Sequence, residues 1–283
     1  MLKRLKNEVV HSVWAMWHQM QEGDFVQTYT EKGFRGNDKE WESMCIPFDE
    51  DAKICLNGVI DRVDLCSLPG EELIKVIDYK SSDSQDLSLA KVYYGLQMQL
   101  LTYLEAAKEM VEKEHKGKEA VPAAMLYYAI KEKNLDWKPE SEEEYEKRVL
   151  DSMKCKGYVN EEPEIIGHLD KSVVNGGELI PGQKSGVVPV AVDKKGLLKK
   201  NSGALSTKDF ETLIAHTKEK IKECGKAILD GKIEAIPYVY EDNDGCTYCP
   251  YGSVCGHESK KDGVREMKKM SDDEVWEALY GDD

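Results

Sequence analysis

The sequence lacks an excess of positive charge. Its 54 acidic residues outnumber 39 Lys and Arg, which leaves a formal net charge of −15 at pH 7. Proteins that bind nucleic acid tightly and without sequence preference normally carry a basic surface, so this charge argues against a free-standing binder of that kind. It does not exclude an enzyme whose substrate is delivered by a partner, because net charge governs association rather than the chemistry of a site.

Two further features are missing. No apolar run reaches the roughly 18 residues that a membrane span needs, and the N-terminal MLKRLKNEVVHSVWAMWHQM is typical of an amphipathic helix rather than a signal peptide. Every Gly-Lys pair is followed by a residue other than Ser or Thr, so no phosphate-binding loop of the GxxxxGK[ST] type is present. We therefore expect a cytoplasmic protein without membrane contact, in which another polypeptide or a missing region supplies any ATP-driven step.

The chain has 283 residues and a 41% hydrophobic composition, which is enough to bury a sizeable core. Helical periodicity occupies residues 2–22 and 89–115, and strand-like runs occupy 43–48, 52–68, 71–80 and 122–130. A further helix is predicted over 206–232, with Ser206 as N-cap and Asp209 as its capping acid, and a short helix near 271–280. This order predicts an α/β domain with a mixed central sheet flanked by helices.

Two strand-like stretches, GVIDRVD and VIDYKSS, carry the charged residues of interest. Side chains alternate along a strand, so Asp78 and Lys80 share one face, whereas Asp61 and Asp64 lie on opposite faces. Asp61 interrupts an otherwise buried strand, and we expect Asp64 to lie where that strand starts to leave the core. We therefore place Asp61 beside Asp78.

Two carboxylates in a partly buried site are costly unless a cation bridges them. Mg²⁺ accepts carboxylate oxygens and retains waters, which leaves room for a substrate phosphate, and Lys80 can orient water or stabilise charge on that phosphate. Gln99 and Tyr103 project from one face of the following helix and can support the site. These parts suit phosphodiester hydrolysis. The alternative is an exposed Asp78–Lys80 ion pair, with Asp61 paired to Arg62 or another cation.

The motifs G-x-x-D-R-x-D, D-Y-K-S and G-L-Q-x-Q-L-x-x-Y follow in this order. They resemble the RecB-type branch of the PD-(D/E)xK nucleases, and the chain is most similar to the C-terminal nuclease region of the AddB component of bacterial AddAB helicase-nucleases. The resemblance implies Asp61 and Asp78 as Mg²⁺ or Mn²⁺ ligands, Lys80 as the catalytic lysine and Gln99 with Tyr103 as a supporting pair. Glu31, in YTEKGF, matches an acid that such enzymes often place upstream.

The same resemblance implies a restriction-endonuclease-like core over residues 1–131. Residues 132–205, which are polar and lack sustained periodicity, are then an insertion, and 206–283 form a C-terminal helix and cysteine segment that packs on the core. The implied activity is a DNA exonuclease in double-strand-break repair and recombination. Its substrate is a single strand delivered by a helicase, and its partner is an AddA-type component of the helicase-nuclease.

Eight cysteines in a chain expected in the cytoplasm are more typical of reduced, buried or metal-bound thiols than of disulfides. Five are scattered and are predicted to be core residues: Cys45, Cys55, Cys66, Cys155 and Cys224. The other three, Cys246, Cys249 and Cys255, form C-x2-C-x5-C, a spacing typical of metal centres. Zinc, completed by His257, and an iron-sulfur cluster both fit such ligands. The resemblance implies a 4Fe-4S cluster, for which this sequence identifies no fourth ligand.

Two other functions remain open. A stand-alone relative of the CRISPR-associated nucleases would share the chemistry without the helicase partner. A catalytically silent DNA-binding or scaffold module would keep the fold and the cluster but lack turnover. The intact set of Asp61, Asp78 and Lys80 favours an enzyme.

Overall fold

The computed structural model describes residues 2–36, 41–49, 52–81, 86–130, 139, 141–258 and 263–281. The chain divides into two compact units. The first contains Met1–Cys45, Cys55–Leu87 and Met98–Ala215, and the second contains Ile46–Ile54, Ser88–Gln97 and His216–Asp283. The first unit therefore holds every acid, lysine, amide and phenol of the predicted site.

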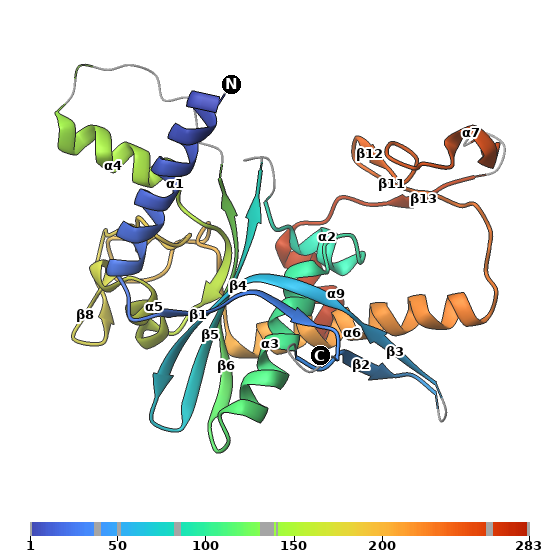
Figure 1. Cartoon of the computed structure of the whole chain (residues 1–283), viewed down its shortest axis with the longest axis horizontal. Helices are drawn as coiled ribbons and strands as arrows, with labels where there is room; N and C mark the ends of the chain where they lie inside the picture. The colour runs from blue at the N-terminus through green and yellow to red at the C-terminus, as the bar shows by residue number, and fades with distance from the viewer. Residues whose placement is uncertain are drawn as a thin grey trace. The chain divides into compact units, whose positions relative to one another are not determined.

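A six-stranded sheet forms the centre of the first unit (Figure 1). Its strands, in spatial order, are β1 (Val26–Phe34), β4 (Gly58–Leu68), β5 (Glu71–Lys80), β6 (Glu119–Ala129), β7 (Lys156–Asn160) and β10 (Ala204–Leu205). The β5–β6 and β7–β10 pairs are parallel, and the other neighbouring pairs are antiparallel. The predicted α/β class, with a mixed central sheet flanked by helices, is confirmed.

The β4–β5 hairpin turns at Pro69 and Gly70, as the sequence predicted. Gly70 has a φ of 86°, a conformation that glycine adopts without steric cost. In the hairpin Arg62 pairs with Ile77 and Asp64 pairs with Lys75. This register fixes which side chains of the two strands share a face.

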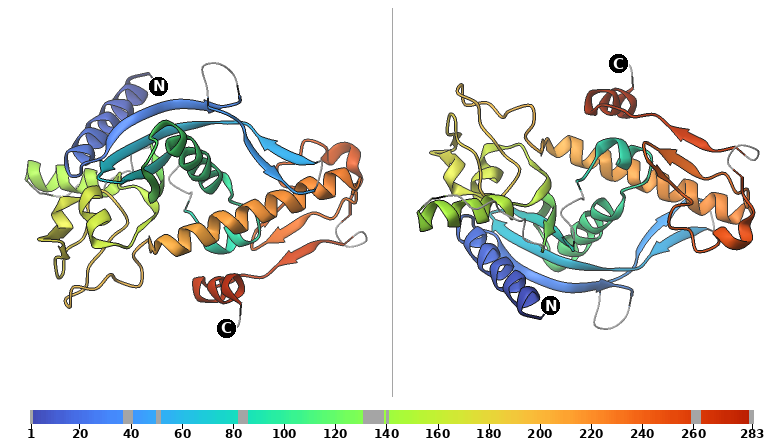
Figure 2. Two further views of the ribbon diagram at one scale, coloured as in Figure 1. Left: turned by 90° about the horizontal axis from the view of Figure 1, so that it is seen from below. Right: turned by 90° about the horizontal axis from the view of Figure 1, so that it is seen from above.

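Helices cover both faces of the sheet (Figure 2). The N-terminal helix α1 (Leu2–Gln21) lies on one face, where its Met16 and Met20 line a small cavity with Arg62 and Lys75. Helix α3 (Gln99–Glu114) lies on the other face and buries Leu100, Leu101 and Leu104. No helix in the described part of the chain has an apolar stretch long enough to cross a membrane.

The predicted continuous helix over 89–115 is wrong at its centre. Helix α2 (Leu89–Tyr93) is capped by Tyr94, and α3 begins only at Gln99. Gly95, in the break, has a φ of 76°, which an α-helix cannot contain. The break makes Gln99 the first residue of its helix, close to the end of β5.

The described part of residues 132–205 supplies strands β7 and β10 to the central sheet. The same region contains α4 (Glu142–Ser152), α5 (Pro163–Leu169), the 3-10 turn η1 (Lys171–Val173), β8 (Val174–Asn175) and β9 (Glu178–Leu179). Val149, Val159 and Ile166 join Leu126 and Tyr128 in one hydrophobic cluster. This region thus contributes to the core, while the domain boundaries proposed from the sequence stay a prediction.

The second unit contains α2 and a small sheet, and the long helix α6 (Thr207–Leu229) includes residues of both units. The small sheet has the order β12 (Asn243–Asp244), β11 (Tyr238–Tyr240), β13 (Arg265–Met267). Short helices α7 (Gly252–Cys255) and α9 (Asp272–Tyr280) complete the unit. The predicted cap of α6 is confirmed, because Ser206 Oγ accepts from Asp209 N at 3.1 Å and Asp209 Oδ2 accepts from Ser206 N at 3.0 Å.

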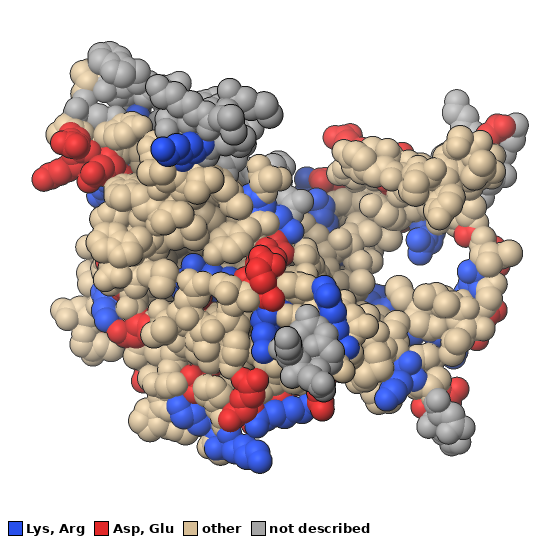
Figure 3. Space-filling view, viewed as in Figure 1, with Lys and Arg blue, Asp and Glu red and all other residues tan. Residues whose placement is uncertain are grey.

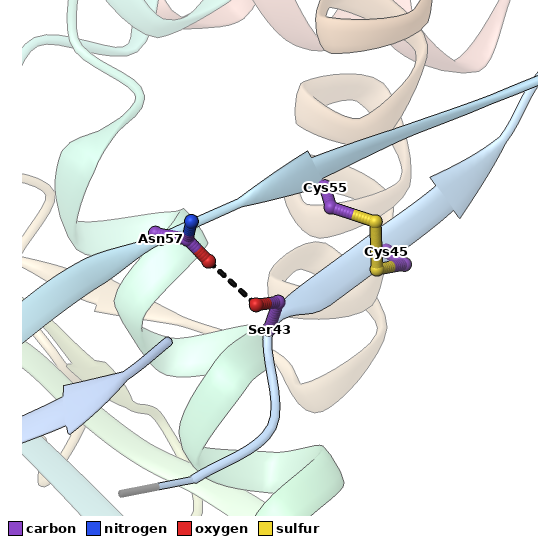
Figure 4. The surroundings of a disulfide bond; sticks show 4 residues. All are labelled: Ser43, Cys45, Cys55 and Asn57. Carbon is purple, nitrogen blue, oxygen red and sulfur yellow. Dashed lines mark hydrogen bonds between the residues drawn. A yellow bond between two sulfur atoms is a disulfide. The ribbon is translucent and has the colours of Figure 1, made fainter. Parts of the chain in front are cut away.

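The short hairpin of β2 (Met44–Pro47) and β3 (Lys53–Leu56) contains a disulfide between Cys45 and Cys55 (Figure 4). Both cysteines are exposed, so their prediction as reduced core residues is wrong. Pairing of the two strands brings their Cα atoms to 4.1 Å, which spacing along the sequence does not reveal. Cys66 and Cys155 are buried as predicted, whereas Cys224 is exposed.

Candidate active site

Asp61 and Asp78 occupy neighbouring strands on one face of the sheet. Arg62 pairs with Ile77, so the antiparallel register sets Asp61 opposite Asp78. The backbone N–H of Tyr79 donates to Asp61 Oδ2 at 2.8 Å, which ties the Asp61 side chain to β5. Asp61 is half-buried and Asp78 is only 2% exposed.

The surroundings of Asp78 disfavour its negative charge. Burial raises the pKa of the Asp78 carboxyl above its usual value, and the charge of Asp61 adds to the shift, although Lys80 opposes it. A carboxylate in this position is stabilised by additional positive charge. The pair is therefore suited to bind a cation.

Lys80 connects the acids to helix α3. Its Nζ lies 2.5 Å from Asp78 Oδ2 and donates to Gln99 Oε1 at 3.1 Å. Gln99 Nε2 in turn donates to the Tyr103 hydroxyl at 3.0 Å. The structure thus brings the five predicted residues together from β4, β5 and α3.

The neighbouring charges also decide against the alternative of a simple exposed ion pair. Asp78 is buried, and Arg62 pairs with Asp64 rather than with Asp61. Asp64 lies on the opposite face, as the odd spacing predicted. The prediction that the strand starts to leave the core at Asp64 is wrong, because Asp64 is completely buried in the middle of β4.

The donor set fits a divalent cation such as Mg²⁺ or Mn²⁺. Asp78 Oδ2 is buried and, apart from the Lys80 ammonium, has no hydrogen-bond partner in the described part of the chain. Asp61 supplies a second carboxylate beside it. No three His, Cys, Asp or Glu side chains among the described residues form a metal-binding group, so Asp61 and Asp78 would hold the ion with water or substrate oxygens completing its shell.

Glu31 lies on β1, the strand next to the one that carries Asp61. It lies between Thr30, which pairs with Arg62, and Lys32, which pairs with Ile60, and this register sets it opposite Asp61. Its side chain is exposed, and its φ of 47° is uncommon for a residue other than glycine. Because the described residues contain no three-acid group, the role of Glu31 stays a prediction.

Tyr127 is a site residue that the sequence did not reveal. It pairs with Asp78 across the parallel β5–β6 strands, and Lys80 Nζ lies 5.1 Å from the centre of its ring. Burial, followed by the charge of Asp78, raises the pKa of Tyr127 to about 12, so the phenol stays protonated at neutral pH. Aligning VIDYK with MLYYA as parallel strands would have identified it, because this register sets Asp78 opposite Tyr127.

The cysteine segment of the second unit has a different character. Cys246, Cys249 and Cys255 are all exposed, and no group of metal-binding geometry includes them in the part of the chain that the structure describes. Asp244 Oδ1 accepts from Cys246 N at 2.8 Å and from Thr247 N at 2.7 Å, which shapes the loop without using a thiol. Loss of hydration and the charges of Asp244 and the two other thiolates raise the pKa of Cys246. As arranged, these residues do not fit a closed four-ligand centre.

A mixed sheet that presents two adjacent carboxylates and a lysine at the end of a strand is the arrangement expected of enzymes that hydrolyse phosphodiesters. The match to known families agrees with this class. The chain belongs to the PD-(D/E)XK nuclease superfamily, whose family model matches residues 1–256.

Curated relatives are each named as one of the subunits of an ATP-dependent helicase/deoxyribonuclease. The protein from Thermoanaerobacter sp. (strain X514) is 32% identical over 280 residues, which is 98% of this chain and 23% of the relative. That from Lachnoclostridium phytofermentans is 33% identical over 272 residues, 95% of this chain and 22% of the relative. That from Clostridioides difficile is 30% identical over 282 residues, 99% and 24% respectively. The chain thus spans less than a quarter of the length of the curated relatives it matches.

Proposed function

We propose that this chain is a metal-dependent deoxyribonuclease that uses Mg²⁺ or Mn²⁺. The observation that carries the proposal is the pair of adjacent carboxylates, Asp61 and Asp78, with the Lys80 ammonium 2.5 Å from Asp78 Oδ2. Membership of a nuclease superfamily and the deoxyribonuclease names of the relatives support it. Exonucleolytic cleavage is part of the proposal.

Each side chain then has a defined task. Asp61 and Asp78 hold the divalent ion, which when bound supplies Lewis acidity toward the scissile phosphate. Lys80 donates hydrogen bonds to the phosphate or to the attacking water, and its positive charge stabilises the negative charge that develops there. Gln99 fixes the Lys80 ammonium by accepting its hydrogen bond, and Tyr103 orients the Gln99 amide by accepting a hydrogen bond from it.

The proposed context is a helicase-nuclease that acts in double-strand-break repair in the cytoplasm. The relatives are named as helicase/deoxyribonuclease subunits, and an AddA-type protein is the proposed partner that delivers a single DNA strand. On the face seen in Figure 3, Lys and Arg side chains are interspersed with Asp and Glu rather than gathered into one basic surface. Such a surface, with a net charge of −15, favours delivery of DNA by a partner over unaided capture.

The proposal of a 4Fe-4S cluster on Cys246, Cys249 and Cys255 rests on their spacing, which zinc would fit equally well, and on the resemblance to nucleases that carry such a cluster. Three thiolates supply three of the four ligands that such a cluster takes. Anaerobic reconstitution with iron and sulfide, followed by visible absorbance and iron analysis of wild type and Cys249→Ser, tests it. No step of the proposed cleavage depends on this centre.

Digestion of end-labelled linear single-stranded DNA in Mg²⁺ or Mn²⁺ tests the nuclease. Wild type should release short products, while Asp78→Ala and Lys80→Ala should not. Lys118→Ala is the matched control, because Lys118 also pairs with a buried carboxylate, Glu72, but on the far end of β5. Circular single-stranded DNA should resist cleavage if the enzyme needs an end.

A wild-type chain that binds DNA but cuts neither substrate, even with the relatives' helicase partner added, would support the silent module instead. Cleavage that needs no partner and persists at physiological salt would favour the stand-alone nuclease. Circular dichroism of each variant establishes that loss of cleavage is not loss of fold.

A further inference from the structure

The face of β4 and β5 opposite the acids carries a second charged cluster, which the proposed chemistry does not use. Asp64 is completely buried, and its carboxylate accepts two hydrogen bonds from the Arg62 guanidinium, Nε to Oδ1 at 2.6 Å and Nη2 to Oδ2 at 2.8 Å. Lys75 Nζ lies 2.9 Å from Asp64 Oδ2. Arg62 is 3% and Lys75 9% exposed, so all three charges are withdrawn from water.

This buried cluster links the two strands at the level of the site. Arg62 and Asp64 belong to β4, and Lys75 belongs to β5, where it pairs with Asp64 in the strand register. Breaking such a cluster by removing one partner is strongly unfavourable, because it leaves an uncompensated buried charge. The cluster therefore holds β4 and β5 in one alignment.

Arg62 also reaches the residues around Asp78. It follows Asp61 directly in the chain, and its side chain lines the same small cavity as Tyr79. Tyr79 lies between Asp78 and Lys80, and its own N–H donates to Asp61 Oδ2 at 2.8 Å. Arg62 thus lies next to Asp61 on β4 and, across the small cavity, beside the β5 segment that carries Asp78 and Lys80.

The fork of the Arg62 guanidinium is suited to this task. A planar guanidinium that makes two parallel bonds to a carboxylate fixes direction as well as distance, whereas an ammonium acts as a point charge. Met16, Gln19 and Met20 of α1 line a small cavity with Arg62 and Lys75, and both charged residues are more than nine-tenths buried, so contact with bulk water is slight.

We propose that Arg62 and Asp64 are positioning residues, which fix the separation of the Asp61 and Asp78 carboxylates from the opposite face and so set their affinity for the divalent cation. The inference rests on the proposed function only in taking these two acids as the cation ligands. Neither Arg62 nor Asp64 touches the cation or the DNA. Their effect passes through the backbone of Tyr79 and through strand alignment.

The chain offers a matched control in Glu72. This residue is 1% exposed, accepts a hydrogen bond from Ser67 of β4, and pairs with Lys118 at 2.9 Å and His115 at 3.1 Å. It is therefore a second buried carboxylate that links β4 and β5, but it lies at the opposite end of β5 from Asp78. Glu72→Gln should destabilise the fold without reaching the site.

The test is calorimetric titration of Mn²⁺ into wild type, Arg62→Lys and Glu72→Gln without DNA, with thermal unfolding measured on each. We expect Arg62→Lys to weaken Mn²⁺ binding about tenfold, the lower end of the effect of outer-shell substitutions on metal affinity. Glu72→Gln should lower the melting temperature at least as much and leave Mn²⁺ affinity unchanged. Cleavage by Arg62→Lys should need about ten times more Mn²⁺ for half-maximal rate and recover most of its rate at saturating Mn²⁺.

The outcomes separate this inference from the proposed function. Wild-type Mn²⁺ affinity in Arg62→Lys, or equal weakening in Glu72→Gln, would overturn the positioning role while leaving the nuclease intact. If Arg62→Lys proves unstable, Arg62→Gln and Asp64→Asn at low temperature provide the same comparison. A wild type whose Mn²⁺ binding is unaffected by Asp78→Ala would instead refute the proposed site, and the positioning role with it.

Discussion

The acid pair of the first unit and the cysteine segment of the second hold their metal-binding groups in opposite ways. Asp61 and Asp78 come from two strands, 17 positions apart along the chain, and are fixed by the β4–β5 register and a Tyr79 N–H. Cys246, Cys249 and Cys255 lie within ten consecutive residues, yet all three are exposed and the described residues contain no metal-binding group. Pairing of two strands fixes distant side chains next to one another, whereas closeness in sequence alone does not bring side chains into a metal-binding arrangement.

The Cys45–Cys55 disulfide supports the same conclusion. Its cysteines are ten residues apart, on paired strands, and the pairing brings their Cα atoms to 4.1 Å. A loop without a partner strand leaves its side chains free to point apart until a ligand orders them. Experiments on DNA cleavage, thermal unfolding and thiol reactivity should therefore distinguish the acid pair from the cysteine segment.

The largest expected difference is in cleavage. Asp61→Asn should reduce single-strand cleavage by about a thousandfold, since losing a metal ligand removes several kcal/mol of transition-state stabilisation and each ~1.4 kcal/mol is tenfold in rate. Cys249→Ser should leave cleavage within about threefold of wild type, measured as initial rate on labelled DNA. Equal losses in the two variants would mean that the cysteine segment takes part in the chemistry.

Reduction of the disulfide is the next effect in size. Closing a short loop of this length stabilises a protein by about 2–3 kcal/mol in the chain-entropy account, so reductant should lower the melting temperature by several degrees. The measurement is thermal unfolding with and without reductant. The Cys45→Ala/Cys55→Ala double variant should melt at the reduced temperature in both conditions, and a wild type insensitive to reductant would show that the hairpin unfolds independently.

Removing the Asp78 charge should raise stability. Because the folded-state pKa of Asp78 is raised, the favourable contribution of its protonated form is present at low pH and is lost as pH rises through that pKa. Asp78→Asn should therefore melt above wild type near pH 8 in chelator, and the difference should shrink as the pH falls through the pKa of Asp78. Mn²⁺ should reverse the order, because only wild type keeps both ligands. A lower melting temperature for Asp78→Asn in chelator would mean that the Lys80 ion pair outweighs burial.

The smallest expected difference between the two regions is in the reactivity of their thiols. In metal-free protein, four exposed thiols, Cys224, Cys246, Cys249 and Cys255, should react rapidly with a chromogenic disulfide. The buried thiols of Cys66 and Cys155 should react only on unfolding, and burial raises the pKa of Cys155 to about 11. Loading a centre on the C-x2-C-x5-C segment should lower the rapid count to one. An unchanged count after reconstitution would contradict a thiolate-bound centre.

Strand alternation predicted most of the candidate site, because it is a local rule. It placed Asp78 and Lys80 on one face and Asp64 on the other, and i, i+4 spacing paired Gln99 with Tyr103. Resemblance to a family supplied the roles. The cap at Ser206 was predicted for the same reason, since it depends on residues three positions apart.

Features that depend on distant pairing were missed. Tyr127 joins the site only through the parallel β5–β6 register, and Cys45 meets Cys55 only through the β2–β3 hairpin. Strands β7 and β10 extend the sheet, β7 beside β6 and β10 beside β7, although residues 132–205 show no sustained periodicity. The break before α3 was missed because a continuous apolar pattern outweighed the one glycine, Gly95, that ends it.

The two-residue turn at Pro69 and Gly70 also has a consequence for the order of folding. Contacts across a tight hairpin are local and form within microseconds, whereas the parallel β5–β6 pair must wait for the crossover through α3. We therefore expect Asp61 and Asp78 to come together before Gln99, Tyr103 and Tyr127 join them. We expect the nascent protein to carry its acid pair exposed to water first, and to cover it only when the crossover helix docks.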